Sequence, residues 1–254
     1  MINSWDDVTL STYIELLDII EGEYTELDII SLLLDVGVQE LEDMPYDDML
    51  SQIENIDFIG KPIPTKNLVN VAIDGELFYP IPFNDIEFGA FIDIEYYISS
   101  GKDYKYNINK ILNILYRRLI KPSDALNKAI LEPYDNWSDT RYQMYDKVPV
   151  TSVYGVLEAY IAWRADIFEK FQGLFSDGDA MDEEEEKKML SEMTAQERKQ
   201  YMNEKNVGKW AWTLYLFKLA DRNPLKMLEA AKMNIIMAFN LLSMMQELKL
   251  EEVK

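Results

Sequence analysis

The residues able to do chemistry in this chain are carboxylates, lysines and tyrosines, because it contains no histidine and no cysteine. Those absences exclude serine-histidine and cysteine-histidine nucleophile pairs, imidazole or thiolate metal sites, and disulfides. Two carboxylates could still act as general acid and base. The nearest such pairs in sequence are Asp85 with Glu87 and Asp93 with Glu95. Their i, i+2 spacing points the two side chains to different sides of a helix, so both pairs are weak catalytic candidates.

The sequence also lacks the usual loops for binding phosphates or metals. No glycine-rich phosphate loop, nucleophile elbow or dinucleotide fingerprint occurs among its 10 glycines. The stretch that begins at Asp177 suggests a calcium loop, but the spacing fails. Its sixth position is Asp182 instead of glycine, and its twelfth is Lys188 instead of glutamate. We therefore expect no metal, no cofactor and no enzymatic activity, with a carboxylate-dependent enzyme as the less favoured alternative.

The composition is typical of a globular, acidic protein. The 254 residues are 48% hydrophobic, enough for a sizeable core, and carry a formal net charge of -21. Nucleic-acid binding depends on lysine and arginine displacing counterions, and anionic membranes repel negative charge, so we expect neither partner. No apolar run could span a bilayer, and the first residues do not form a signal peptide. We expect a protein of a cytoplasm or of a particle assembled there.

The negative charge is concentrated in residues 1–60, which we call the acidic module. It holds 16 Asp and Glu residues and no Lys or Arg, whereas the rest of the chain holds 30 acids and all 25 bases. One interpretation is a solvated surface kept soluble by self-repulsion, and the other is a docking face for a basic partner. Only docking predicts binding that weakens with salt. The candidate contact residues are Asp6, Asp7, Asp47 and Asp48.

Hydrophobic spacing predicts a mainly α fold with a small β-hairpin, in which an α+β N-terminal half precedes a helical C-terminal half. Three short helices are expected in the acidic module, beginning near Thr9, Thr25 and Pro45. Alternating residues around Asp74-Gly75 predict a hairpin over 68–80. Helical spacing predicts further helices over 86–98, 107–121 and 150–172.

An irregular, proline-flanked stretch in the middle of the chain is the expected junction of two regions. The first is an acidic α+β region over 1–135 that contains the hairpin. The second is a helical region over 136–254 that ends in a long αα-hairpin. The first helix of that hairpin is aromatic-rich and contains Trp210 and Trp212.

The last predicted helix runs from Pro224 to about Leu250. Its apolar residues recur at spacings of three and four, which forms a two-heptad seam. The seam residues are Leu228, Ala231, Ile235, Ala238, Leu242 and Met245. Packing on the chain's own helices explains the seam, and pairing with a second copy or another subunit is the alternative, so a homo-oligomer stays open. Outside the seam lie three adaptable methionines, which are further candidate partner contacts: Met233, Met237 and Met244.

Several segments together carry a resemblance to a known family. They are the opening Trp5–Ile14, Asp43-Met44-Pro45, the central hairpin, Phe91-Ile92-Asp93, the Tyr134–Arg141 junction and Trp210-Ala211-Trp212. In this order they are similar, loosely and over most of the chain, to tail-assembly chaperones and related small assembly proteins of tailed bacteriophages. The resemblance implies a non-enzymatic protein in the host cytoplasm that binds an aggregation-prone tail component or other phage structural proteins. The alternative is a component of the virion, such as a neck, ring or internal protein.

Overall fold

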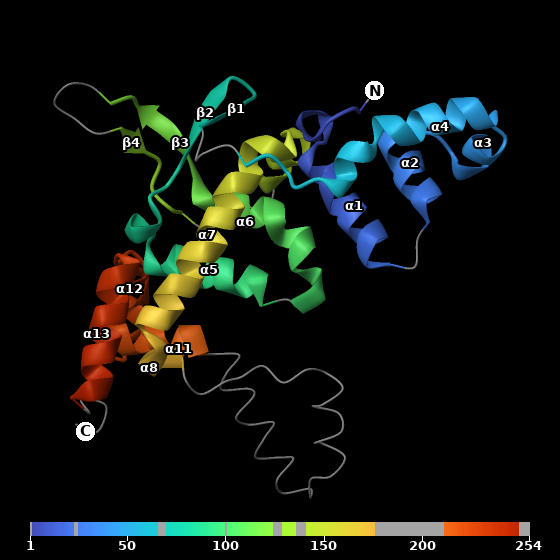
Figure 1. Cartoon of the computed structure of the whole chain (residues 1–254). Coiled ribbons are helices and arrows are strands. Elements are labelled where there is room, and N and C mark those ends of the chain that lie inside the picture. The colour runs from blue at the N-terminus through green and yellow to red at the C-terminus, as the bar shows by residue number, and fades with distance from the viewer. Residues whose placement is uncertain are drawn as a thin grey trace, which may run out of the picture. The chain divides into compact units, whose positions relative to one another are not determined.

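The computed structural model describes residues 2–22, 25–65, 70–99, 101–123, 129–135, 141–175 and 211–248 (Figure 1). This part of the chain is mainly helical and contains a small antiparallel sheet, which confirms the predicted fold class. The fold therefore follows the hydrophobic spacing of the sequence, except at two segments described below.

The chain divides into two compact units, each made from two stretches of sequence. Unit 1 comprises Met1–Ile81 and Ile94–Ala162, and unit 2 comprises Pro82–Asp93 and Trp163–Lys254. The predicted boundary between 135 and 136 falls inside unit 1 and does not divide the structure. The units are divided instead within two continuous helices, α5 (Phe88–Ile98) and α7 (Val150–Lys170), each of which contributes residues to both units. A boundary inside a helix leaves no proline, glycine or charge signal in the sequence.

The described residues of the acidic module form four α-helices and two short 3-10 helices. They are η1 (Trp5–Asp7), α1 (Leu10–Glu21), α2 (Glu26–Leu34), α3 (Val38–Glu42), α4 (Tyr46–Asn55) and η2 (Asp57–Gly60). The Thr9 hydroxyl caps α1 by accepting from the backbone N–H of Thr12 at 3.2 Å. The Thr25 N–H donates to Oδ2 of Asp28 at 2.7 Å, as half of a capping box for α2. The three predicted helices are confirmed, and α3 is an additional one.

A small apolar core holds the acidic module to the first turn of α7. Its buried side chains are Trp5, Val8, Leu16, Leu33 and Val150. The indole N–H of Trp5 donates to the backbone oxygen of Lys61 at 3.0 Å, and its ring lies edge-on to Phe58 with centroids 5.3 Å apart. The backbone N–H of Val150 donates to the oxygen of Val8 at 2.9 Å. These contacts fix both ends of the module, at η1 and η2.

Within the described residues the sheet has four strands in the order β1-β2-β3-β4, each antiparallel to its neighbour. The predicted hairpin is confirmed as β1 (Val71–Ile73) and β2 (Glu76–Pro80). Its turn residues Asp74 and Gly75 have φ of 50° and 82°, the left-handed conformation that a tight two-residue hairpin requires.

The prediction of one helix over 107–121 was wrong in its second half. Helix α6 (Ile108–Leu115) ends early, and the chain continues as strand β3 (Tyr116–Lys121), which pairs with the short β4 (Ile130–Leu131). Strand β3 also pairs with β2, so that Tyr116 lies opposite Pro80 and Arg118 opposite Phe78. This pairing gives partners to an edge of the hairpin that would otherwise be open, and such long-range pairing outweighs local helical spacing.

Unit 2 is helical around an aromatic core. Besides the shared helices it contains η3 (Phe83–Asp85), α8 (Gln172–Phe175), α11 (Ala211–Leu219), η6 (Pro224–Lys226), α12 (Met227–Ala231) and α13 (Ile235–Glu247). Aromatic rings from α5, α7, α11 and α13 and from the residue between α7 and α8 meet in the core: Phe88, Phe91, Phe168, Phe171, Trp212 and Phe239. Gly89 allows α12 to approach α5, because a Cβ at this position would lie 3.0 Å from the Cβ of Ala231. Trp210 lies outside the described residues.

The continuous C-terminal helix predicted from Pro224 is broken into η6, α12 and α13. At the break, the N–H of Phe88 donates to the oxygen of Met233 at 2.7 Å, and the N–H of Ile235 donates to Ile86 at 2.9 Å. Asn234 caps α13 by accepting from the N–H of Ile236 at 3.0 Å. These bonds use backbone groups that a continuous helix would pair internally. The predicted seam is therefore confirmed only in α13, where Ile235, Ala238 and Leu242 are buried, whereas Leu228 is exposed.

Candidate partner-binding surface

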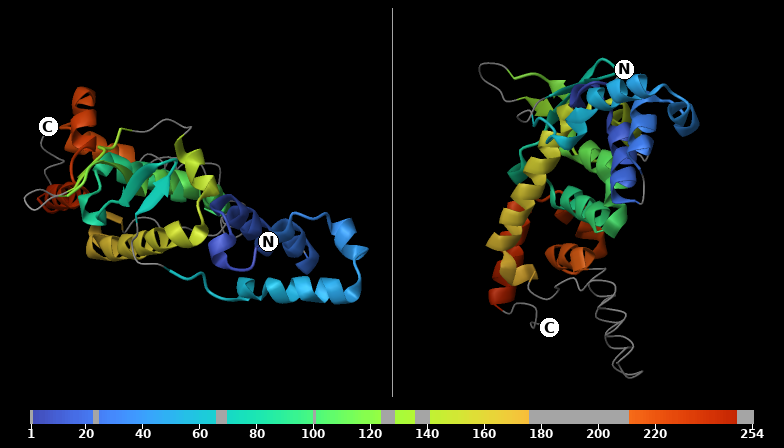
Figure 2. Two further views of the ribbon diagram at one scale, coloured as in Figure 1. Left: turned by 90° about the horizontal axis from the view of Figure 1, so that it is seen from above. Right: turned by 45° about the vertical axis from the view of Figure 1, so that its right-hand side comes forward.

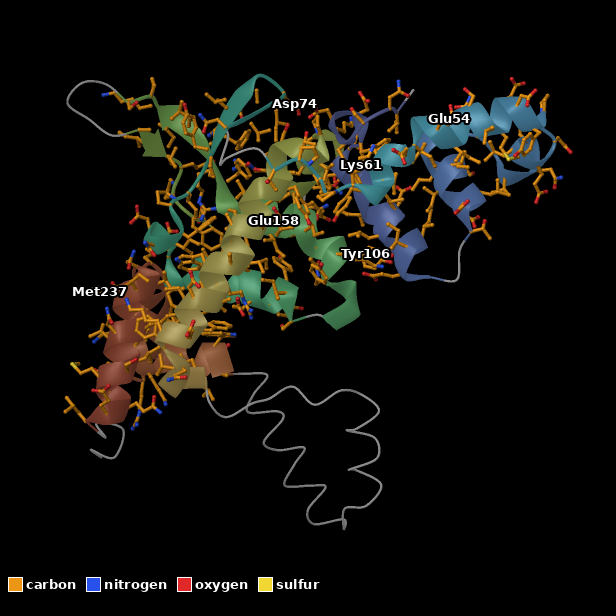
Figure 3. All side chains as sticks on the ribbon, viewed as in Figure 1. Glu54, Lys61, Asp74, Tyr106, Glu158 and Met237 are labelled. Atoms are coloured by element: carbon orange, nitrogen blue, oxygen red, sulfur yellow. The ribbon has the colours of Figure 1, made fainter. Side chains whose placement is uncertain are left out.

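The candidate residues Asp47 and Asp48 lie in the first turn of α4, where their charge complements the helix dipole. Both side chains are exposed, and so are Asp43 just before the helix and Glu54 near its end. Within the described ranges none of these four carboxylates makes an ion pair. Figure 3 marks Glu54 on α4 and Lys61, the first basic residue of the chain, after η2. Helix α4 thus presents negative charge that the described chain does not neutralise.

The other two candidates, Asp6 and Asp7, are also exposed, but their carboxylates have internal partners. Oδ1 of Asp6 accepts from the hydroxyl of Thr151 at 2.5 Å. Oδ2 of Asp7 accepts from the backbone N–H of Asn3 at 3.1 Å and from the hydroxyl of Ser4 at 2.9 Å, and these bonds lower the pKa of Asp7. Nothing in the sequence distinguishes the four aspartates from one another. In the structure, Asp6 and Asp7 hold the N-terminal segment in place, whereas Asp47 and Asp48 do not.

A buried lysine neutralises another part of the acidic module. The ammonium of Lys105, in η4 (Gly101–Asn107), pairs with Asp18 and with Oε2 of Glu21, the latter at 2.8 Å. The Tyr106 hydroxyl donates to Oδ1 of Asp18 at 2.6 Å. Lys105 and Tyr106 together lower the pKa of Asp18. Sequence reasoning missed this cluster because 84 residues separate Lys105 from Glu21, and no local spacing connects them.

We expect Asp18→Asn to lower the free energy of unfolding at neutral pH and to have little effect at low pH. The folded-state pKa of Asp18 is depressed, so its contribution is present above the ordinary value of 3.8 and is lost as the pH falls below it. Asparagine resembles the protonated acid, so the difference between wild type and variant should shrink as the pH falls below 3.8. Urea unfolding at pH 7, 5 and 3 measures the difference. Glu15→Gln, at an exposed position of α1, is the control, and a pH-independent difference for Asp18→Asn would contradict the assignment.

The three candidate methionines do not lie in equivalent environments. Met237 and Met244 are exposed on α13, seven residues apart and therefore on one face, and Leu248 continues that face (Figure 3 marks Met237). Met233 is half-buried, and its backbone oxygen accepts from Phe88. Two of the three positions are thus available on the surface of unit 2, and the third supports the break between α12 and α13.

An ion cluster around the buried Glu132, which the sequence did not reveal, supports the sheet. Glu132 is 7% exposed and accepts from Nη1 of Arg141 at 2.9 Å and from Nη2 of Arg118 at 3.4 Å. Arg118 also donates to Glu76 at 2.8 Å, and the guanidinium of Arg141 lies over the ring of Phe78. Because these residues come from β2, β3, the segment after β4 and η5 (Arg141–Lys147), the cluster ties the strands together.

The residues considered for catalysis are distributed over separate environments. Glu95 is buried in α5 and Asp93 half-buried, whereas Asp85 is exposed and Glu87 half-buried. No three carboxylates in the described ranges lie close enough together to hold a metal ion, and the segment beginning at Asp177 is outside those ranges.

An open hollow of about 780 Å³ lies between β1 and η5, and Asp146 on its wall accepts from Asn109 at 2.9 Å. None of the described helices is long and apolar enough to cross a membrane.

Comparison of the chain with protein-family models, with curated proteins and with solved structures finds no match. No residue therefore takes a role from a relative.

Proposed function

We propose that this chain is a non-enzymatic assembly protein that binds other proteins, with the acidic module as the docking surface for a basic partner. The observation that carries the proposal is the set of exposed acids on and beside α4 that have no ion-pair partner in the described chain. Like charges so close together cost folding free energy through repulsion. A basic partner would convert that cost into attraction.

The resemblance to tail-assembly chaperones suggests where such a protein would act. We place it among assembly proteins of tailed bacteriophages, where it would bind phage structural proteins in the host cytoplasm. A virion component is the second candidate, and the exposed Met237 and Met244 on α13 favour it, because a lasting interface commonly buries apolar surface.

Cross-linking in infected cells, combined with mass spectrometry of purified particles, tests this proposal. An assembly chaperone should cross-link to a phage structural protein through residues 1–60 and be absent from mature particles. A virion component should be present in particles at a fixed copy number. Absence of any cross-linked protein partner in cells and of the chain from particles would reject both.

A further inference from the structure

Helix α4 carries an apolar stripe that the described residues of unit 1 cover only in part. Tyr46, Leu50 and Ile53 are spaced i, i+4, i+7, so they share one face of the helix, and they are 75%, 42% and 37% exposed. None of the α4 side chains whose environment the structure describes is buried, and the half-buried ones are Met49 and Gln52. Figures 1 and 2 show α4 along the edge of the unit, with α1 and α2 to one side of it only.

A helix as short as α4 is not expected to leave apolar side chains exposed. Isolated helices shorter than about 12–15 residues are marginal in water, and α4 has 10 residues. A short amphipathic helix gains most of its stability by packing its apolar face against another surface. Half of that face, at Met49 and the following Ile56, is partly covered within the unit. The half formed by the stripe is more exposed, most of all at Tyr46.

Carboxylates run beside the stripe. Asp47 and Glu54, seven residues apart, lie on the line of the helix surface next to Leu50, and Asp43 is the C-cap of the preceding helix α3. All three are exposed and make no ion pair in the part of the chain that the structure describes. The face therefore combines a linear apolar contact with a parallel row of negative charge.

We propose that α4 docks a basic amphipathic helix of a partner protein along the Tyr46, Leu50 and Ile53 stripe. Lysine or arginine side chains of that helix would lie against Asp43, Asp47 and Glu54. The inference rests on the proposed function and gives the chemistry of the partner. The stripe spans two helical turns, about 10.5 Å, which matches apolar residues at i, i+3, i+4 and i+7 of a second helix. A second copy would bring two carboxylate rows together, so charge complementarity favours the basic partner.

Two synthetic peptides of 18 residues, made only of leucine and lysine, test the proposal against the full chain. In the first, leucines share one helical face; in the second, the same residues are shuffled so that they do not. Wild-type protein should bind the first peptide about tenfold or more tightly than the second, because only the first presents an apolar face. Binding should also slow hydrogen exchange of the backbone amides over 46–55, which a purely electrostatic contact elsewhere would leave unchanged.

The matched variants are Leu50→Ser with Ile53→Ser, and Leu225→Ser with Leu228→Ser as control. Each replaces two exposed apolar side chains, the control pair lying in unit 2. The first pair should weaken binding of the amphipathic peptide about tenfold, and the second should leave it unchanged. The control pair should leave the melting temperature unchanged, because Leu225 and Leu228 are 90% and 78% exposed, whereas the first pair, 42% and 37% exposed, should lower it slightly. Peptide binding is therefore measured well below both melting temperatures, which separates lost docking from lost folding.

Other results overturn the inference in distinguishable ways. Equal binding of both peptides, with strong salt dependence, would reject helix docking and leave the acidic docking surface intact. Binding of neither peptide would reject the acidic docking surface as well. A dimer seen by light scattering and lost on Leu50→Ser with Ile53→Ser would show that a second copy covers the stripe, which also rejects a basic partner there.

Discussion

Replacing Phe239 by alanine is expected to destabilise unit 2 by about 3–5 kcal/mol, the cost of removing a buried aromatic side chain and leaving a cavity. Phe239 is fully buried on α13, and its ring centroid lies 5.3 Å from that of Phe171 and 5.5 Å from that of Phe91. It also stacks on Trp212 at 6.2 Å. Chemical denaturation followed by tryptophan fluorescence would measure the loss, because Trp212 reports on the same core.

The control for this substitution is Met237→Ala, two residues away on the same helix but exposed. Its effect should stay within about 0.5 kcal/mol, as is usual for surface positions. Phe239→Leu keeps most of the volume and should cost less than the alanine variant. If Phe239→Ala and Met237→Ala have similar effects, the aromatic cluster does not form the core of unit 2.

Neutralising Asp47 and Asp48 together, as asparagines, is expected to slow association with the basic amphipathic peptide by about threefold to tenfold at low salt. Exposed charges at the edge of an interface accelerate encounter and affect dissociation less. The effect should fade between about 0.01 M and 0.15 M salt, where the Debye length falls from about 30 to about 8 Å. Stopped-flow or surface-plasmon measurements of both rate constants give the result directly.

The comparison variant replaces Asp6 and Asp7 by asparagine, which removes the same amount of charge. We expect this variant to have a lower free energy of unfolding than wild type, because the two carboxylates accept hydrogen bonds from Thr151, Asn3 and Ser4. Asp47 and Asp48 lack such side-chain partners in the described structure, so their neutralisation removes only their interaction with the dipole of α4 and should lower stability less. Association that is insensitive to salt, or unaffected by either pair of substitutions, would indicate that the acidic module is only a solvated surface.

The contrast between these two pairs of aspartates shows how far a sequence specifies a binding surface. The 16 acids without a base in residues 1–60 are visible in the sequence, and they predict where negative charge lies. Which carboxylates are already occupied depends on Thr151 and Lys105, which lie far along the chain. The apolar spacing of Tyr46, Leu50 and Ile53 can likewise be read from the sequence. The exposure of these side chains cannot, because an amphipathic pattern looks the same whether or not another surface covers it.

Local chemistry by itself determined the hairpin and most helices of this protein. Asp74-Gly75 favours a two-residue turn, and Thr9 and Thr25 cap helices with their own side chains, so neighbours in sequence supply the deciding interactions. Tertiary structure decided that the residues after Leu115 form a strand and that the C-terminal helix breaks at 232–234. There, backbone N–H and C=O groups found partners in β2 and in the residues around Ile86. A buried backbone group must be paired, and where a distant segment offers that pairing, it overrides the weak preference of a local helical pattern.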